Sequence, residues 1–225
     1  MFFAPRRRPR VQAPEPADPG DEGSTTRWLE DLARGDVQAL DHLYRREADR
    51  VYRYALAVCG NTAWAADATQ EAFVALATRP EGFDPARGAL GAYLAGVARH
   101  ALSARWRELR REGPLGGGAE APPDAADAAA DAPPGADVEA AASPETLLVR
   151  AQEVQALWAA LRALPVVFRE AVVLVDLQER SYVEAAQIAG LELNTLRTRL
   201  HRARARLAEL LGAGAGAPRA QGVSK

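Results

Sequence analysis

Apolar residues recur at the spacing of an α-helix in two stretches of the chain, 27–111 and 143–211. The clearest case follows Asp36, after which apolar positions fall on one face of a long helix. Asp36 is a favourable N-cap for that helix and Gly60 a favourable C-terminal stop. Because no stretch alternates like a strand over a useful length, the pattern predicts an all-α fold with two small helical domains.

We expect four helices in each domain. Those of the first domain cover about 28–33, 37–59, 62–78 and 89–111. Those of the second domain cover about 143–164, 166–176, 181–190 and 194–210. Ser181 and Glu184 have the spacing of a capping box, which predicts a helix start at that point. A tight turn at Gly190 then joins a short helix to a long one, as in a helix-turn-helix.

Three segments lack this periodicity. Residues 1–26 are rich in proline, charge and small residues, which predicts a disordered arm. Residues 112–142 are mostly Ala, Pro, Gly and Asp, and no Lys or Arg occurs between Arg111 and Arg150. This composition predicts a flexible acidic linker. Residues 212–225 are rich in Gly and Ala, and we expect them to form a loose tail.

The composition argues against several classes of function. The 225 residues are 48% hydrophobic, but much of this is alanine and only 6% is aromatic, so the helical cores should be thin. A single cysteine excludes an internal disulfide, and three scattered histidines argue against a metal site. No Gly-rich phosphate loop occurs, and we expect no catalytic residue, no cofactor and no enzymatic activity. No apolar run approaches the roughly 20 residues of a membrane span, so we expect a cytoplasmic protein with no membrane insertion.

The last predicted helix carries a basic face. Five polar residues lie opposite or beside its leucines, at 100° per residue: Arg197, Thr198, Arg199, His201 and Arg202. The helix has five arginines and no acidic residue between Thr195 and Ala208. Such a face suits phosphate neutralisation and bidentate contacts to guanine in the major groove of DNA. The alternative is an ordinary solvated face, although such faces usually mix acids with arginines.

Two helices of the first domain show contrasting outer faces. A basic stripe near Trp106 is formed by Arg99, Ser103, Arg107 and Arg110. This stripe suits a melted DNA strand whose bases can stack, but a solvated helix end rich in arginine is an equal alternative. The helix at 62–78 instead has an acidic to apolar outer face, formed by Asp67, Gln70, Val74 and Ala77. That face is typical of protein docking, and a plain surface helix is the alternative.

Short motifs follow one another in order along both domains. In the first domain they are Asp67-Ala68-Thr69-Gln70-Glu71-Ala72-Phe73, Phe83-Asp84-Pro85-Ala86-Arg87-Gly88, Tyr93-Leu94 and Val97-Ala98-Arg99. In the second they are Leu164-Pro165, Phe168-Arg169-Glu170, Ser181-Tyr182, Glu184-Ala185-Ala186 and Leu200-His201-Arg202-Ala203-Arg204-Ala205-Arg206-Leu207. Together these motifs resemble regions 2 and 4 of the sigma-70 superfamily, specifically its small extracytoplasmic-function type.

The resemblance implies a role for each surface. In the family, region 2.2 docks on the clamp of core RNA polymerase, and the matching positions here are Asp67, Gln70, Glu71, Phe73 and Val74. Regions 2.3 and 2.4 open the −10 promoter element, which implies contacts from Arg87, Arg99, His100, Ser103 and Arg107. Region 4 touches the polymerase flap and reads the −35 element, here with Arg197, Thr198, Arg199, His201 and Arg202. An anti-sigma factor is a further partner that the resemblance implies.

The predicted function is therefore that of a sigma factor, which binds core RNA polymerase and promoter DNA. Two alternatives stay open. A stand-alone helix-turn-helix regulator accounts for the second domain but gives the face at 62–78 no role. A sigma-like protein that sequesters polymerase or an anti-sigma factor is permitted by His100 and Ala104, which stand where the family has asparagine and aspartate.

Overall fold

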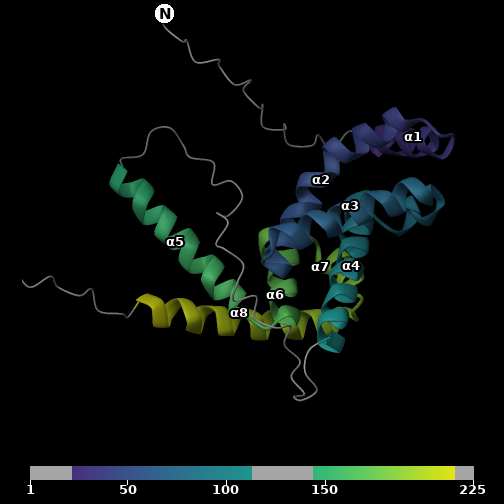
Figure 1. Cartoon of the computed structure of the whole chain (residues 1–225). Helices are drawn as coiled ribbons and strands as arrows, with labels where there is room; N and C mark the ends of the chain where they lie inside the picture. The colour runs from purple at the N-terminus through teal and green to yellow at the C-terminus, as the bar shows by residue number, and fades with distance from the viewer. Residues whose placement is uncertain (1–21, 113–143, 216–225) are drawn as a thin grey trace, which may run out of the picture.

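The computed structural model describes residues 22–112 and 144–215, and within these ranges every regular element is helical. The first domain contains α1 (Glu22–Ala33), α2 (Val37–Cys59), α3 (Thr62–Thr78) and α4 (Leu90–Glu112). The second contains α5 (Pro144–Arg162), α6 (Val166–Val172), α7 (Tyr182–Ala189) and α8 (Leu193–Ala215), as Figure 1 shows. The all-α prediction is confirmed. The predicted linker lies outside the described residues except for Glu112, which ends α4.

Two helices are longer than the sequence predicted. α1 begins at Glu22 rather than near residue 28, so the assignment of residues 22–26 to a disordered arm is wrong. Thr25 Oγ1 accepts a hydrogen bond of 2.5 Å from Arg46 Nη1, which fastens the added turn to α2. α8 continues to Ala215 instead of ending near residue 210. The alanines of this last segment favour a helix and offset the cost of its glycines.

The first domain is formed by α2, α3 and α4, which pack against one another, while α1 packs on α2. Its largest fully buried side chains include Leu43, Tyr54, Leu76 and Leu94. The ends of α2 follow the sequence prediction. Asp36 Oδ1 accepts a hydrogen bond of 2.8 Å from the backbone N–H of Gln38, and Gly60 ends the helix in the left-handed conformation at φ 70°.

The second domain contains the predicted helix-turn-helix in α7 and α8. Ser181 Oγ accepts a hydrogen bond of 3.2 Å from the N–H of Glu184, whose carboxylate accepts from the N–H of Ser181, so the capping box is confirmed. Gly190 closes α7 at φ 61°, and α8 begins at Leu193, one residue earlier than predicted. The buried side of α8 packs through Leu196, Leu200 and Ala203.

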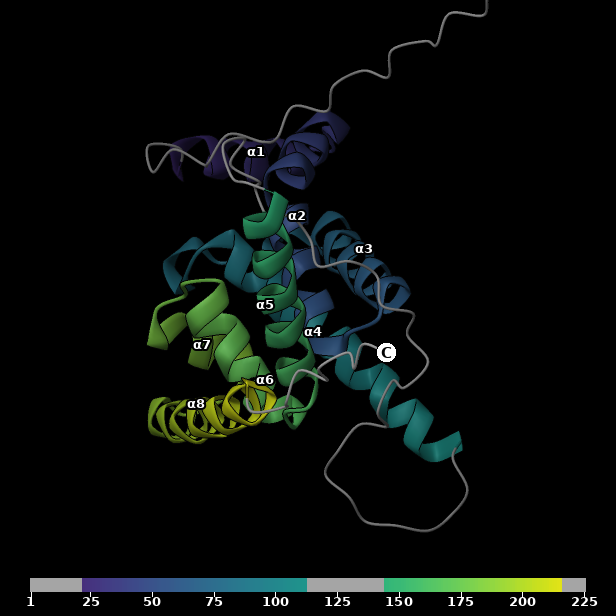
Figure 2. The ribbon, with the colours of Figure 1, turned by 90° about the vertical axis from the view of Figure 1, so that its left-hand side faces the viewer.

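The two domains pack against each other. α6 contacts α2 and α7 contacts α4, so the buried residues of both domains form one continuous core. Figures 1 and 2 both show α6 and α7 above α8 and next to the first domain. Across this interface Gln178 Nε2 donates a hydrogen bond of 2.9 Å to the carbonyl oxygen of Arg50. The sequence predicted two tethered domains and did not predict this contact between them.

Candidate functional site

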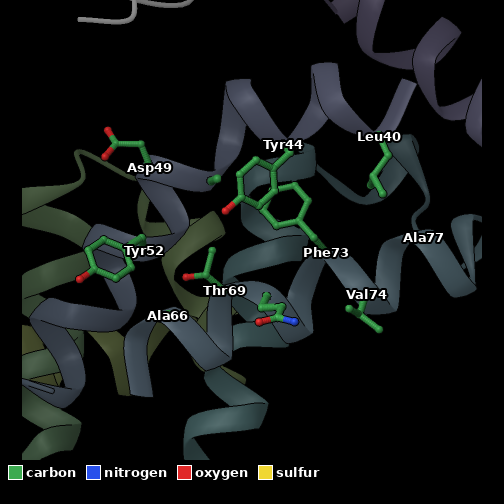
Figure 3. A pocket seen from close by; sticks show the side chains of 11 residues that line it. Leu40, Tyr44, Asp49, Tyr52, Ala66, Thr69, Phe73, Val74 and Ala77 are labelled. Carbon is green, nitrogen blue, oxygen red and sulfur yellow. The ribbon is translucent and has the colours of Figure 1, made fainter. Parts of the chain in front are cut away.

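A groove with a cavity volume of about 510 Å³ opens between α2 and α3. Figure 3 shows its lining: Leu40, Tyr44, Ala48, Asp49 and Tyr52 from α2, and Ala66, Thr69, Gln70, Phe73, Val74 and Ala77 from α3. The ring of Phe73 is buried against that of Tyr44, with ring centroids 4.8 Å apart. Tyr44 and Val74 are 48% and 54% exposed. Exposed apolar side chains gathered in one groove are typical of a protein-docking surface.

The groove brings together three of the five residues predicted to contact polymerase. Gln70, Phe73 and Val74 line it, whereas Asp67 and Glu71 are exposed elsewhere on α3. Phe73 is buried, so it shapes the floor of the groove and offers little surface of its own. The wall that α2 contributes was not predicted, because periodicity places the apolar residues of that helix on one face without showing which of them stay exposed.

A second cavity, of about 370 Å³, lies between α4, α7 and the segment 82–88, which contains a short 3-10 helix at Pro85–Arg87. Phe83 and Tyr93 form an aromatic wall with ring centroids 5.6 Å apart. Gln187 and Ile188 of α7 complete the lining from the second domain. This cavity is therefore shared by both domains, a feature that local sequence patterns could not reveal.

The residues predicted to contact the −10 element lie in three environments. Arg87 and His100 are exposed and line the second cavity. Arg99 is largely covered, with 25% of its side chain exposed, and it pairs with a carboxylate of the second domain. Ser103 and Arg107 lie farther along α4, where Arg107 Nε donates a hydrogen bond of 3.3 Å to the carbonyl oxygen of Ser103.

Glu170 of α6 is the centre of the polar contact between the domains. The residue is 4% exposed, and its Oε1 accepts hydrogen bonds from the Tyr54 hydroxyl at 2.9 Å and from Arg99 Nε at 2.7 Å. Burial raises the pKa of Glu170, and the charge of Arg99 opposes that rise. Burial and the nearby carboxylate also raise the pKa of Tyr54 well above its ordinary value, so its hydroxyl remains a donor.

The adjacent Arg169 is a second link between the domains. Its guanidinium donates hydrogen bonds to the carbonyl oxygens of Leu161 at 2.9 Å and Leu164 at 3.0 Å in its own domain. It also donates to the carbonyl oxygen of Val58 at 2.8 Å, near the end of α2. Carbonyls at helix C-termini lack partners within the helix and favour a cation. Arg169 and Glu170 together therefore join α6 to both α2 and α4 of the first domain.

The basic face of α8 is open to solvent. Four of the five residues predicted to contact the −35 element are exposed: Arg197, Thr198, His201 and Arg202. The fifth, Arg199, is half-buried, and its charge acts on Glu170 at the domain interface. The Arg197 guanidinium lies 5.9 Å from the ring centroid of Tyr182. Thus most of the predicted face is available to a ligand while the two domains are packed together.

The described residues contain one cysteine, Cys59, which is buried at the end of α2. Burial raises the pKa of its thiol to about 11, so the thiol is protonated at neutral pH. No group of three or more His, Cys, Asp and Glu side chains in these ranges could hold a metal ion. None of the helices formed by residues 22–112 and 144–215 is long and apolar enough to span a bilayer.

Comparison with known proteins finds relatives that span both domains. The family model for Sigma-70 region 2 matches residues 43–112, and that for Sigma-70, region 4 matches residues 154–207. The ECF RNA polymerase sigma factor SigE of Mycolicibacterium smegmatis is 33% identical over 197 residues, which cover 86% of this chain and 70% of the relative. The ECF RNA polymerase sigma factor SigM of Mycobacterium tuberculosis is 35% identical over 193 residues, covering 85% of this chain and 86% of the relative.

Two solved structures are similar in fold. The sigma factor RpoE from Bartonella quintana, in complex with the anti-sigma factor NepR, gives a TM-score of 0.57 at 21% identity, covering 78% of this chain and 98% of that chain. CnrH, in complex with the cytosolic domain of CnrY, gives a TM-score of 0.56 at 22% identity, covering 84% of this chain and 98% of that chain. At these identities the likeness concerns the fold.

Proposed function

The chain belongs to the extracytoplasmic-function sigma factors of RNA polymerase, and from this membership we propose that it binds the core enzyme and directs initiation at promoters with −10 and −35 elements. The observation that carries the proposal is the pairing of two surfaces on one chain. The region-2 domain has an exposed apolar groove, and the region-4 domain has an exposed basic helix face. A stand-alone DNA-binding regulator would need only the second surface.

Core polymerase docks on the first domain through the groove between α2 and α3. The exposed side chains of Tyr44 and Val74 offer apolar contact area, and Gln70 adds an amide to the lining. Asp67 and Glu71 place negative charge on the exposed part of α3, which favours a partner surface with complementary charge. The proposed partner of this groove is the polymerase clamp, and that of the second domain is the flap.

The basic face of α8 enters the major groove at the −35 element, with contacts from Arg197, Thr198, Arg199, His201 and Arg202. Arginine side chains suit this task because one guanidinium can donate to both acceptors of a guanine or neutralise a phosphate. The −10 element is captured on the first domain as a separated strand, with contacts from Arg87, Arg99, His100, Ser103 and Arg107. The aromatic wall of Phe83 and Tyr93 offers a surface on which an unstacked base can lie.

We further propose that an anti-sigma factor regulates the protein. RpoE, which shares the fold, was solved with the anti-sigma factor NepR, and CnrH with the cytosolic domain of CnrY. The proposed activity requires only non-covalent binding, so the chain contributes no catalytic group and needs no cofactor. Its place of action is the cytoplasm, because polymerase and the chromosome are there.

Run-off transcription with purified core polymerase tests the proposal. The template carries the DNA upstream of the gene for this protein, together with a set of other upstream fragments from the same genome. We expect specific transcripts only when both the protein and the core enzyme are present. Tight binding to duplex DNA with no dependence on polymerase would instead favour a stand-alone regulator. Stable binding to core without transcripts from any fragment would favour a sequestering protein, and failure to bind core would contradict the proposal.

A further inference from the structure

The arginines of α8 differ in what holds them. Arg204 forms a bidentate ion pair with Asp176 of the π-helical turn η4 (Val173–Leu177), in which its Nε and Nη2 donate to the two carboxylate oxygens at 3.1 and 2.5 Å. Arg202 has no carboxylate partner among the residues that the structure describes. Arg204, unlike Arg202, is therefore neutralised by a carboxylate from outside the helix.

Arg204 lies on the side of α8 that is proposed to face DNA. It follows Arg197, one of the proposed −35 contacts, by seven residues, so the two side chains share one stripe about two helical turns apart. Both lie near Tyr182 of α7. The Arg197 guanidinium is 5.9 Å from the centroid of its ring. Hydrogen bonds to Asp176 raise the pKa of Arg204, and Tyr182 adds smaller contributions.

The position of Arg204 along α8 places it where a DNA backbone passes. A recognition helix reads bases mainly with its N-terminal residues, so side chains on later turns lie nearer the phosphates. Half of the Arg204 side chain is exposed. A guanidinium at this place would reach a phosphate if Asp176 did not hold it.

From this arrangement we propose that Asp176 restrains sequence-independent DNA binding by holding Arg204 away from the phosphate backbone. The inference rests on the proposed function, since it concerns the helix that reads the −35 element. Phosphate contacts strengthen binding to every sequence alike, whereas base contacts select the promoter. The ion pair carries no net charge, and its carboxylate repels phosphate. Asp176 thereby limits retention of the protein on bulk genomic DNA, which offers a very large number of competing sites.

The geometry of this pair lets it compete with DNA. Most exposed ion pairs contribute little to stability, but a bidentate arginine–carboxylate pair is among the exceptions. Asp176 lies 28 residues away along the chain, and both α6 and α7 pack on α8, which fixes the carboxylate relative to the helix. Arg206 instead pairs with Glu209 of its own helix, and both of these side chains are more than half exposed. The local pair therefore opposes DNA binding less than the pair with Asp176.

Full-length protein carrying Asp176→Asn tests the restraint. The change removes the negative charge and keeps the side-chain size. The matched control is Glu153→Gln, which removes the same charge from an exposed position of α5. Arg204→Ala and the double variant with both changes complete a double-mutant cycle, which isolates the coupling between the two side chains. The measurement is fluorescence anisotropy with a labelled duplex of arbitrary sequence, titrated at several salt concentrations.

We expect Asp176→Asn to bind this duplex about fivefold tighter than the control does, because the freed Arg204 neutralises one further phosphate. The slope of log affinity against log salt concentration should steepen by about 0.9, which corresponds to the release of one more counterion. The gain should vanish in the double variant. Arg204→Ala alone should change the affinity little, because the paired guanidinium does not contact DNA.

Equal affinity of Asp176→Asn and the control, in variants whose circular dichroism matches the wild type, would overturn the restraint. A gain that persists in the double variant would also overturn it, since the cause would then be net charge and not Arg204. Arg204→Ala is an independent test, because weaker binding by this variant would show that the paired arginine already contacts DNA.

Run-off transcription with core polymerase separates this proposal from the proposed function. If the wild type drives polymerase-dependent transcription but Asp176→Asn gains no affinity, the proposed function stands without the restraint. If Asp176→Asn gains affinity through Arg204 but no protein supports transcription, the restraint on duplex binding stands and the sigma assignment fails.

Discussion

Two surfaces of the first domain differ in what covers them. The groove between α2 and α3 exposes apolar side chains, with Tyr44 at 48% and Val74 at 54%. The second surface is formed by α2 and α4 and is covered by the second domain. There the buried carboxylate of Glu170 accepts hydrogen bonds from Tyr54 and Arg99. An apolar groove left open within the chain gains free energy only when another molecule covers it. The carboxylate lies beside a continuous apolar core that both domains share, so this second surface is already covered within the chain.

The difference suggests that one domain carries two kinds of binding surface. The groove is available at all times, so polymerase could dock there while the domains remain packed. The surface near Arg99 is covered by the second domain, because Arg99 pairs with Glu170 across the interface. The following predictions test each half of this comparison.

Arg169→Met should have the largest effect, because it leaves several buried carbonyl oxygens without a donor. We expect the free energy of unfolding to fall by about 3 kcal/mol, or roughly 150-fold in the unfolding equilibrium. Thermal denaturation followed by circular dichroism measures this loss. Arg150→Met is the matched control on an exposed position of α5 and should change stability by less than about 0.5 kcal/mol. Equal melting of the two variants would show that Arg169 does not hold the interface together.

The interface also marks the limit of what the sequence could predict. The caps at Asp36 and Gly60 and the capping box at Ser181 were predicted because each depends on a few neighbouring residues. Arg169 and Glu170 were recognised only as part of a motif. Their partners in the first domain lie 71 to 116 residues away along the chain, and no local sequence pattern predicts such a contact. Glu170 is only 4% exposed, but from the sequence alone an acidic residue is expected to be a surface charge.

Cys59 reports on the same interface through its reactivity. Its pKa of about 11 lowers the thiolate fraction at pH 8 roughly 100-fold relative to an ordinary thiol, and burial restricts access further. We expect slow labelling by a thiol reagent in the native protein, rising with pH toward 11, and fast labelling in denaturant. Cys59 follows Val58, whose carbonyl accepts from Arg169, so Arg169→Met should accelerate native labelling. Rapid labelling of the wild type at pH 8 would mean that this end of α2 is not covered.

Val74→Glu tests the open groove. A charge placed among exposed apolar side chains should weaken binding to core polymerase about 30-fold, the effect of losing a contact worth roughly 2 kcal/mol. Because Val74 is half exposed, the melting temperature should change little. Val37→Glu is the matched control, since Val37 is 76% exposed at the start of α2 and lies outside the groove. If both variants bind core equally well, polymerase does not use this surface.

The sequence predicted the side of the groove that α3 forms and not the side that α2 forms. The α3 side followed from helical periodicity, which correctly placed Gln70 and Val74 on the exposed face of that helix. The α2 side depends on how far two helices stand apart, and periodicity gives no distance between helices. Phe73 was predicted as a contact residue on its motif, whereas the packing places it beneath Tyr44.

Arg202→Ala tests the exposed basic face of α8. We expect about tenfold weaker binding to duplex promoter DNA and a matching loss of run-off transcript, because one guanidinium contact to a base or phosphate contributes roughly 1–3 kcal/mol. Arg206→Ala is the matched control. Arg206 lies on the same helix and pairs with Glu209 at 2.8 Å in an exposed ion pair, so its removal should change affinity little.

A salt titration separates the two possible roles of Arg202. Loss of a phosphate contact lowers the salt dependence by about one counterion and weakens all sequences alike, whereas loss of a base contact weakens the promoter selectively. If the two variants bind equally, DNA recognition is not concentrated on the face predicted from the sequence, and single-strand capture near Arg99 would have to supply most of the promoter specificity.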